Sequence, residues 1–309
     1  MGGQVLFRRH DFVLRGVGVE DRAAFDAALA QSPQGDLLQC YGWGELKRRS
    51  GWIPLRCLIE RRGAPVAAAT ILKRRIPGTP WSFFYLPRGP ALDSGDRATL
   101  AFFRDALRHL ARRHRAAFAK LDPDVADDAA AGADADAADP KVLLRRCGFT
   151  PVPPDDSVIG GTQPRAVWRL NLDKPLDGLH AGLAKDNKYF LRRAEREKIV
   201  VRQGEEADLA IFHQLFEGTG KRKGFIVRGL GYFEAMWRNL APDGHLKLFI
   251  ADYKGPPLAA VLIWRIIAWA HGEGCEFFDF GGVPWQRSAP MEHFKGSFGR
   301  VSAGAHRGV

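Results

Sequence analysis

The strongest constraint on the fold is a phrase that the chain contains twice, 192 residues apart. The first copy, LRCLIERRGAPVAAATILK, begins at Leu55, and the second, KLFIADYKGPPLAAVLIWR, begins at Lys247. Each copy predicts a strand, a tight turn at Gly63 or Gly255, and a second strand. The repeat indicates a duplicated unit, so we expect two related domains.

The segments around the first copy predict a mixed α/β domain of the acyltransferase type. WSFFYLP predicts a third strand and AAFAKLDP a last one. Between them, DRATLAFFRDALRHLARRH predicts a helix, because its apolar residues recur every three or four positions. An aromatic-rich helical segment precedes each copy, at residues 41–52 and 232–244. The order of hairpin, strand, helix and strand is typical of such a domain.

The second copy is expected to be incomplete. Lys73 and Phe118 in the first copy are 45 residues apart, whereas the matching Arg265 and Phe277 are only 12 apart. The difference of 33 residues corresponds to a strand, a loop and most of a helix. RIIAWAHGEG is too short for a crossover helix, which with its loops needs about a dozen residues or more. We therefore expect a missing block after Trp264.

The charge distribution indicates an anionic partner. The formal net charge is +11, and seven of the 35 acidic residues lie in the segment 122–139, which has no lysine or arginine, so the rest of the chain carries +18. Such a surplus favours nucleic acid, a phosphorylated substrate or an anionic membrane face, although it also serves solubility. Low complexity predicts a flexible surface loop at 127–140. No apolar run reaches the roughly 18–20 residues of a membrane span and no signal peptide is recognisable, so we expect a cytoplasmic protein.

Eight phrases, in order along nearly the whole chain, resemble the Fem-type non-ribosomal peptidyltransferases, which use aminoacyl-tRNA to add amino acids to the peptidoglycan stem peptide. They are LLQCYGWGELKRRSGW, FFYLPRGPALD, FAKLDPD, QPRAVWRLNL, DNKYFLRRAEREKIVVRQG, FEGTGKRKGFIVRGLGYFEAMW, GCEFFDFGGVP and EHFKGSFG. The resemblance implies two GNAT-like (acyl-CoA N-acyltransferase-like) domains, residues 1–157 with 290–309 and residues 158–289. After the strand that matches LAAVLIW, the family carries a strand with a substrate-contacting tyrosine and a Pro-Asn-Tyr-type segment opening a helix. Both are absent here, where the repeat is also short, so the second domain is expected to be truncated.

Two residues are candidates for the chemistry of aminoacyl transfer, which needs positioning, an acceptor for the amine proton and stabilisation of an oxyanion. Lys295 could neutralise negative charge at the tRNA terminus or the tetrahedral centre, and the resemblance implies the same lysine. Asp122 ends a predicted strand, where sites of α/β folds often lie. It matches a family aspartate near the acceptor amine, which it could orient or deprotonate. A surface lysine and an Asp-Pro turn residue are the structural alternatives.

Other basic residues are candidates for binding. Arg228 precedes Tyr232 by four positions, so both could face one way at the start of a helix. The resemblance implies that Lys47, Arg228 and Tyr232 hold the diphosphate and sugar of a peptidoglycan precursor; the alternative is an ordinary exposed base and a core tyrosine. KDNKYFLRRAEREK predicts either a solvated helix face or a surface for the tRNA acceptor stem. Its candidate tRNA contacts are Lys185, Lys188, Arg192 and Arg196.

We predict a cytoplasmic, monomeric aminoacyltransferase of cell-wall synthesis that uses no cofactor and no metal. Its expected partners are aminoacyl-tRNA and either UDP-muramoyl-pentapeptide or a lipid-linked muropeptide, with peripheral contact at the cytoplasmic membrane face. Two alternatives stay open. One is a GNAT-like N-acyltransferase that uses acyl-CoA or another amine acceptor. The other is a catalytically degenerate protein that binds tRNA or muropeptide, which the missing block favours. The sequence contains no P-loop, H-E-x-x-H or G-x-S-x-G motif.

Overall fold

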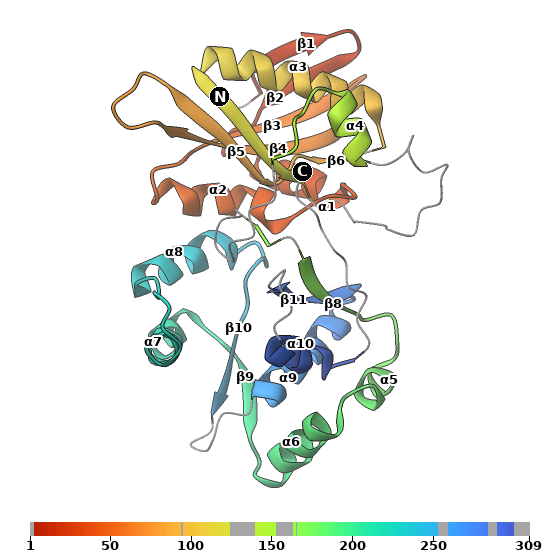
Figure 1. Ribbon diagram of the computed structural model, residues 1–309, viewed down its shortest axis with the longest axis vertical. Coiled ribbons are helices and arrows are strands. Elements are labelled where there is room, and N and C mark those ends of the chain that lie inside the picture. The colour runs from red at the N-terminus through yellow and green to blue at the C-terminus, as the bar shows by residue number, and fades with distance from the viewer. Residues whose placement is uncertain are drawn as a thin grey trace. The chain divides into compact units, whose positions relative to one another are not determined.

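The computed structural model of the chain describes residues 3–93, 95–123, 140–152, 163–164, 166–252, 259–283 and 289–299. The predicted acidic loop therefore lies outside the described residues, apart from Pro140. Contacts divide the chain into two compact units, Met1–Gln163 with His306–Val309 and Pro164–Ala305. Both units combine helices and strands, as predicted (Figure 1). Among the described residues, no helix has the length and apolarity needed to cross a membrane.

The described strands of the first unit form one seven-stranded sheet in the order β1-β2-β3-β4-β5-β7, with the short β6 paired to β4. Neighbours are antiparallel except β5 and β7, which run parallel, so their C-terminal ends lie at the same edge. The strands are β1 (Val5–Arg9), β2 (Phe12–Gly16), β3 (Ile53–Arg61), β4 (Ala64–Arg75), β5 (Ser82–Arg88), β6 (Ala91–Leu92) and β7 (Ala116–Pro123). The predicted hairpin, third strand and last strand of this domain are thus confirmed.

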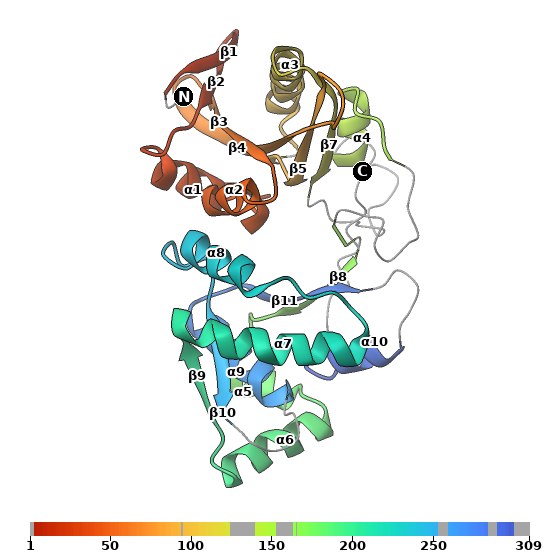
Figure 2. The ribbon, with the colours of Figure 1, turned by 90° about the vertical axis from the view of Figure 1, so that its left-hand side faces the viewer.

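Helices cover both faces of this sheet. Helix α3 (Arg97–Arg113) lies on one face, and α1 (Arg22–Gln31) and α2 (Tyr41–Arg48) lie on the other (Figure 2). The 3-10 turn η1 (Leu37–Gln39) precedes α2, and α4 (Pro140–Arg146) follows β7. Asp96 caps α3 by accepting hydrogen bonds from the backbone N–H groups of Ala98 and Thr99. The apolar stripe of α3, including Phe103, packs on Phe84 and other strand residues to form the core.

The second unit has fewer described strands than the first. Its described strands form two separate antiparallel pairs, β9 with β10 and β8 with β11. The strands are β8 (Ala166–Asn171), β9 (Val200–Gly204), β10 (Leu248–Asp252) and β11 (Phe277–Val283). The helices are α5 (Leu176–Ala181), α6 (Lys185–Arg196), α7 (Leu209–Lys223), α8 (Leu230–Leu240), α9 (Ala259–Gly272) and α10 (Ala289–Gly296), with a 3-10 turn η3 (Glu206–Asp208).

The predicted second strand of copy two is wrong, because residues 259–264 open helix α9. In the first unit the equivalent strand, β4, has a partner on each side. In the second unit the missing block would have supplied the next strand. Without that partner, the apolar run continues through Arg265 with no Gly or Pro break, and a helix satisfies its backbone internally. Its buried residues include Val261 and Ile267, so this segment belongs to the core.

The break in the second sheet follows from the same missing block. In the first unit β4 and β5 join β3 to β7. In the second unit β10 and β11 hold the corresponding positions of the repeat, but no described strand lies between them in the chain. The sheet therefore falls into two pairs.

Helix α10 packs within the second unit. The Ser297 carbonyl accepts a hydrogen bond from the backbone N–H of Ala184 at 2.8 Å, and the Ser297 hydroxyl accepts one from the Asn187 side chain at 2.8 Å. Phe298 is buried in the core of this unit. The boundaries at 157/158 and 289/290, and the assignment of 290–309 to the first domain, stay predictions.

Candidate functional site

Asp122 is a buried carboxylate at the C-terminal end of β7, and only 7% of it is exposed. Its Oδ2 accepts a hydrogen bond from the Tyr85 hydroxyl at 2.8 Å, and its Oδ1 accepts one from the backbone N–H of Arg88 at 2.7 Å. The donors come from β5, which runs parallel to β7 and places Pro87 opposite Asp122. The Gln163 side chain donates a longer bond of 3.4 Å to the Tyr85 oxygen. The carboxylate is therefore held on both oxygens and fixed in orientation.

A buried glutamine supports this cluster from behind. Strands β4 and β5 pair only over Leu72–Arg75. Earlier in β4, Ala67 and Ala68 pair with the short strand β6 instead. Gln39 fills the opening between β4 and β5 and is fully buried. Its Oε1 accepts from the Thr70 N–H at 2.8 Å, and its Nε2 donates to the Thr70 carbonyl at 3.3 Å and to the Pro87 carbonyl at 2.7 Å. The amide thus replaces a strand neighbour of β4 and holds the peptide whose N–H binds Asp122.

Gly89 is required by this arrangement, because a Cβ atom at that position would collide with the Gln39 amide.

Lys47 lies in the last turn of α2 and is half-buried. Its Nζ is 4.3 Å from the centre of the Trp43 ring, within the range of a cation–π interaction. The Trp43 Nε1 is buried and has no hydrogen-bond partner among the described residues. The stacked indole therefore limits the directions in which the ammonium can point.

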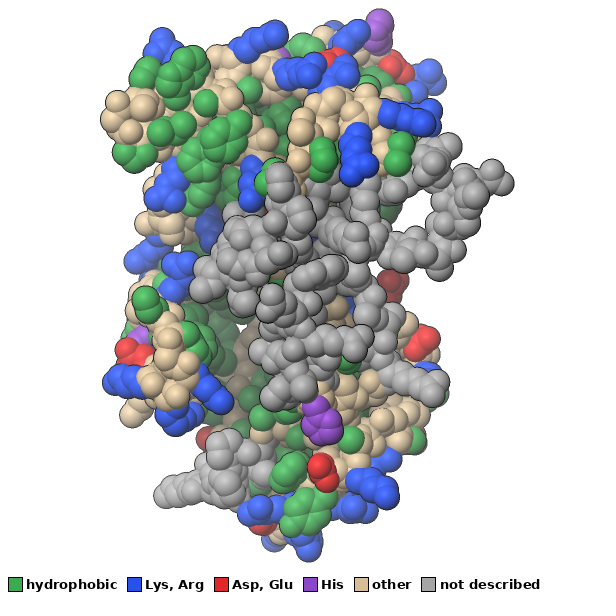
Figure 3. All heavy atoms as spheres, in the orientation of Figure 1, with side chains coloured by type: hydrophobic (Ala, Val, Ile, Leu, Met, Phe, Trp, Pro, Cys, Tyr) green, Lys and Arg blue, Asp and Glu red, His purple; other side chains and the backbone are tan. Residues whose placement is uncertain are grey.

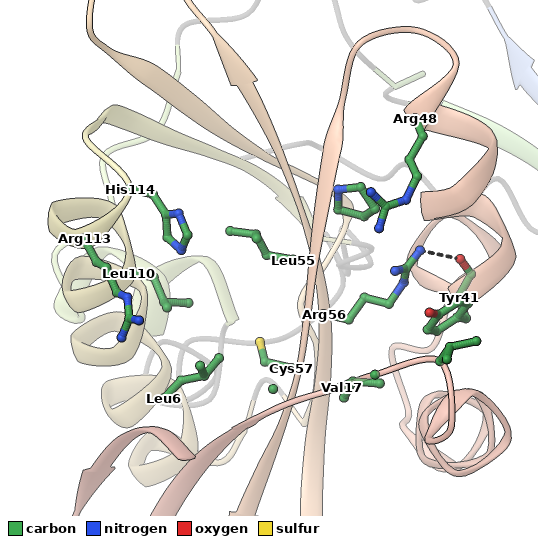
Figure 4. Close-up of a pocket in the computed structure, with 14 residues that line it drawn as sticks. Leu6, Val17, Tyr41, Arg48, Leu55, Arg56, Cys57, Leu110, Arg113 and His114 are labelled. Atoms are coloured by element: carbon green, nitrogen blue, oxygen red, sulfur yellow. Dashed lines mark hydrogen bonds between the residues drawn. The ribbon is translucent and has the colours of Figure 1, made fainter. Parts of the chain in front are cut away.

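A cavity of about 290 Å³ in the first unit holds none of the predicted site residues. Figure 4 shows its polar walls, which carry Arg48, Arg56, Arg113 and His114. Arg56 is almost fully buried and donates to the Tyr41 carbonyl and to Glu45, each at 2.8 Å. Burial lowers the pKa of His114 and so favours its neutral form. We assign this cavity no part in the reaction.

Lys295 is not the surface lysine of the structural alternative, because only 8% of it is exposed. Its Nζ donates to the carbonyls of Gly281 and Gly282 at 3.1 and 2.8 Å. These carbonyls lie at a bulge, where the β8–β11 register shifts between Asp279 and Gly282. Burial lowers the pKa of Lys295, and the negative charge of Asp279 partly offsets that effect. Among the described residues, these two carbonyls are the acceptors of the ammonium group, which has three N–H groups, so a third can serve a ligand.

Arg228 and Tyr232 come together as their spacing predicts. The guanidinium carbon of Arg228 lies 4.6 Å from the centre of the Tyr232 ring. Arg228 precedes the N-cap of α8, and Tyr232 lies in its first turn. Arg228 is exposed and Tyr232 half-buried. Burial raises the pKa of Tyr232, which Arg228 partly opposes, so the phenol stays protonated at neutral pH.

The four candidate tRNA contacts lie on α6, whose opposite face buries Leu191 and Ala194. Tyr189 on the same helix is 50% exposed. Lys188 is partly engaged, because its Nζ donates to the Ala181 carbonyl at 2.7 Å. The other three, Lys185, Arg192 and Arg196, are exposed.

A second-unit cavity of about 350 Å³ adjoins this helix. It is lined by the first turns of α6 and α9 and by His293 and Phe294 of α10. Within either unit taken alone, the described residues bring no three His, Cys, Asp or Glu side chains close enough to share a metal ion.

Sequence reasoning missed the groups that hold Asp122. Tyr85 and Arg88 lie in the phrase FFYLPRGPALD and Gln39 in LLQCYGWGELK, and nothing in their local pattern marks them as partners of an aspartate 34 or more residues away. The one signal was the density of Pro and Gly after Tyr85, which is unusual at the end of a buried strand.

The comparisons with known sequences agree on one family. A sequence profile of the FemAB family matches residues 21–255. The chain is 30% identical over 225 residues to a lipid II:glycine glycyltransferase of Staphylococcus aureus strain MRSA252, covering 73% of this chain and 52% of that protein. The protein of the same name in strain USA300 matches with the same identity and coverage. The chain thus spans about half the length of the curated relatives it matches.

Solved structures confirm the predicted fold class. The crystal structure of FemX superposes with a TM-score of 0.83 at 21% identity, covering 93% of this chain and 94% of that one. A conserved protein of unknown function from Bacteroides thetaiotaomicron VPI-5482 superposes with a TM-score of 0.54 at 11% identity, covering 94% and 96%. At these identities the likeness concerns the fold alone.

Proposed function

The chain belongs to the FemAB family, and we propose that it is an aminoacyltransferase that moves an amino acid from aminoacyl-tRNA to the stem-peptide amine of a peptidoglycan precursor. The observation that carries the proposal is its 30% identity, over 73% of its length, to a protein named lipid II:glycine glycyltransferase. The acceptor would be a UDP-linked or lipid-linked muropeptide. Geometry in each unit supports a part of this chemistry.

In the first unit, Asp122 suits the acceptor amine. An attacking amine must be neutral and must lose a proton as the new amide bond forms. Asp122 is held by Tyr85 and by the Arg88 N–H, so its oxygens keep a constant direction. A carboxylate so placed can orient the amine or accept its proton. This pre-organisation costs nothing at the moment of reaction, because the supporting bonds exist before the substrate binds.

In the second unit, Lys295 suits the developing negative charge. Two glycine carbonyls orient its ammonium group, which leaves one N–H for a ligand oxygen. A charge held in a site shielded from water stabilises an oxyanion more than an exposed lysine would. We therefore assign to Lys295 the stabilisation of negative charge, either at the tRNA terminus or on the oxygen of the tetrahedral centre.

For the acceptor, we assign Lys47, Arg228 and Tyr232 to the diphosphate and sugar. Lys47 acts as a point charge and Arg228 as a planar donor with a fixed fork. The stacking of Arg228 on Tyr232 reduces the entropy that the guanidinium loses when it binds a phosphate.

For the donor, we assign the exposed face of α6 to phosphates of the tRNA acceptor stem. The cavity beside Lys185 supports this assignment, because the start of α6 and the side chains of His293 and Phe294 line it together. Phe294 is 40% exposed and can stack on a terminal base. Since Lys295 follows directly in α10, the donor ester would lie close to the lysine.

The test is a transfer assay with the purified chain, a pool of charged tRNAs, and UDP-muramoyl-pentapeptide or its lipid-linked form in separate reactions. The expected product is an acceptor heavier by one aminoacyl residue, read by mass spectrometry. A parallel reaction replaces charged tRNA with acyl-CoA. Transfer from acyl-CoA alone would support the N-acyltransferase alternative. No transfer from any donor would refute the enzymatic proposal.

The broken sheet of the second unit favours one further candidate, a binding protein with little activity. No described strand joins β10 to β11, so a wall expected beside the acceptor is absent from the described part of the chain. A family-like strand and helix inserted between Trp264 and Arg265 would split helix α9, so it should raise transfer only if residues 259–264 then pair as a strand with the inserted one. Binding of tRNA and muropeptide by the unmodified chain, with transfer only after the insertion, would establish this second function.

A further inference from the structure

An arginine-lined groove of about 660 Å³ lies in the first unit, at the start of β7 and so at the end of that strand opposite Asp122, and none of the proposed site residues lines it. One wall is the end of the β4–β5 hairpin, with Pro80 and Trp81, and the other is the C-terminal part of α3 and the turn after it. That second wall carries Arg108, Arg112 and Arg115.

The two walls are tied together by the residue after Trp81. The Ser82 N–H donates to the Arg115 carbonyl at 2.8 Å, and the Ser82 hydroxyl donates to the His114 carbonyl at 2.9 Å. The hairpin is closed by the Ile76 N–H, which donates to the Trp81 carbonyl at 2.9 Å. The groove is therefore a built feature of the fold and not a gap between independent loops.

The groove is cationic without compensation. Among the described residues, no acidic side chain lines it and none of its three arginines forms an ion pair with a carboxylate. Arg108 and Arg112 are four positions apart on one helix, a spacing at which like charges repel. Such an arrangement costs stability unless an anion binds. Residues of this end of α3 also interact favourably with the helix dipole, so any test must include a measurement of folding.

Exposed apolar side chains adjoin the charges. Trp81, which lines the groove beside them, is 50% exposed, and Pro80 next to it is exposed as well. Figure 3 shows hydrophobic side chains gathered over the hairpin end of this unit, with basic groups beside them.

We propose that this surface, formed by the hairpin turn 76–81 with Arg108, Arg112 and Arg115, docks the chain on an anionic phospholipid bilayer. The arginines would pair with headgroup phosphates while Trp81 enters the interfacial layer, where indole rings are favoured. A nucleic-acid backbone would also attract the arginines, but it offers no apolar counterpart for the exposed Pro77, Pro80 and Trp81 of the turn. The inference goes beyond the proposed transfer reaction and does not depend on it.

The experiment is co-sedimentation of the whole chain with vesicles, in the absence of tRNA and muropeptide. One set contains phosphatidylglycerol in phosphatidylcholine, and the other contains phosphatidylcholine alone. We expect binding to the anionic vesicles that weakens as salt rises. Replacing one of the three arginines by glutamine should weaken binding roughly fivefold, and replacing all three on the order of 100-fold. Trp81→Ser should weaken binding at every salt concentration.

The matched control is Arg8→Gln, which removes an exposed arginine of β1 outside the groove and should leave binding unchanged. Melting temperatures of all variants separate loss of folding from loss of binding. If the triple variant does not fold, Trp81→Ser and the single replacements still decide the question. Equal binding by wild type and variants, or no binding to anionic vesicles at low salt, overturns the proposal. If the wild type binds an RNA duplex but no vesicles, and the arginine variants lose the RNA binding, the groove would be assigned to nucleic acid instead.

Discussion

Replacing Gln39 by leucine should destabilise the first unit much more than its single side chain would indicate. Gln39 is buried in the opening between β4 and β5, and its amide pairs with three backbone groups: the Thr70 N–H, the Thr70 carbonyl and the Pro87 carbonyl. Leucine has nearly the same volume, so the change creates no large cavity. It instead leaves all three groups buried without a partner.

The magnitude follows from these three groups. Each orphaned buried group costs about 1 to 3 kcal/mol. The 3.3 Å bond to the Thr70 carbonyl is the weakest of the set. Three such groups sum to about 3 to 9 kcal/mol. Because one of the three bonds is weak, we expect the lower part of that range, about 3 to 5 kcal/mol, in the free energy of unfolding, a large part of the roughly 5–15 kcal/mol that a domain has in total. Thr70→Val is a milder version, because it removes only the 2.6 Å bond from the Thr70 hydroxyl to the Gln39 carbonyl, at about 1 to 3 kcal/mol.

Hydrogen–deuterium exchange is the appropriate assay, because a chain of two units need not unfold in one step. Amides of β4 and β5 should lose protection in Gln39→Leu, while those of β8 and β11 should keep it and serve as the internal reference. Gln4→Leu, at an exposed glutamine, is the control for added hydrophobicity. Protection in β4 within about 0.5 kcal/mol of wild type would refute the reasoning, since surface substitutions alone produce changes of that size.

The remaining predictions concern the proposed site and the acidic segment. If transfer is observed, Lys295→Ala should abolish it with only a small loss of stability, because the two carbonyls that lose their donor belong to an exposed and a half-buried glycine and can bind water instead; a near-normal kcat would remove its role in charge stabilisation. Since burial lowers the pKa of Lys295, wild-type transfer should begin to fall at a lower pH than an exposed lysine would allow, as the ammonium loses its proton, and a rate unchanged past the ordinary lysine pKa would contradict this. Asp122→Asn keeps the shape of the side chain and should lower kcat by about 100-fold or more, whereas equal rates would show that Asp122 only orients its neighbours. Lys47→Ala and Arg228→Ala should mainly raise the KM for the acceptor, and an unchanged KM with reduced kcat would argue against phosphate binding. Deletion of 127–139 should leave the melting temperature nearly unchanged, because the segment has almost nothing to bury, and a large drop would show that it packs on the body of the protein.

Local patterns were sufficient for the first unit because its elements agree with their sequence periods. The hairpin around Gly63, helix α3 and strand β7 all lie where apolar spacing and turn residues predict them. The incompleteness of the second domain was also readable, since it required only a comparison of two spacings in one chain. The pairing of Arg228 with Tyr232 followed from helical spacing, which is itself a local property.

Tertiary structure alone decided the remainder. Residues 259–264 are apolar in a way that suits a strand or a helix, and the choice depends on whether a partner strand exists to satisfy their backbone. The burial of Lys295 depends on two glycine carbonyls at a bulge in β11, which no pattern around the lysine reveals. The position of Asp122 depends on the Arg88 N–H, which reaches it because β7 lies parallel beside β5, and on Gln39, which holds that peptide through the Pro87 carbonyl where β4 and β5 separate. Periodicity reports which residues face a core, but hydrogen bonds between distant segments form only when the chain has brought them together.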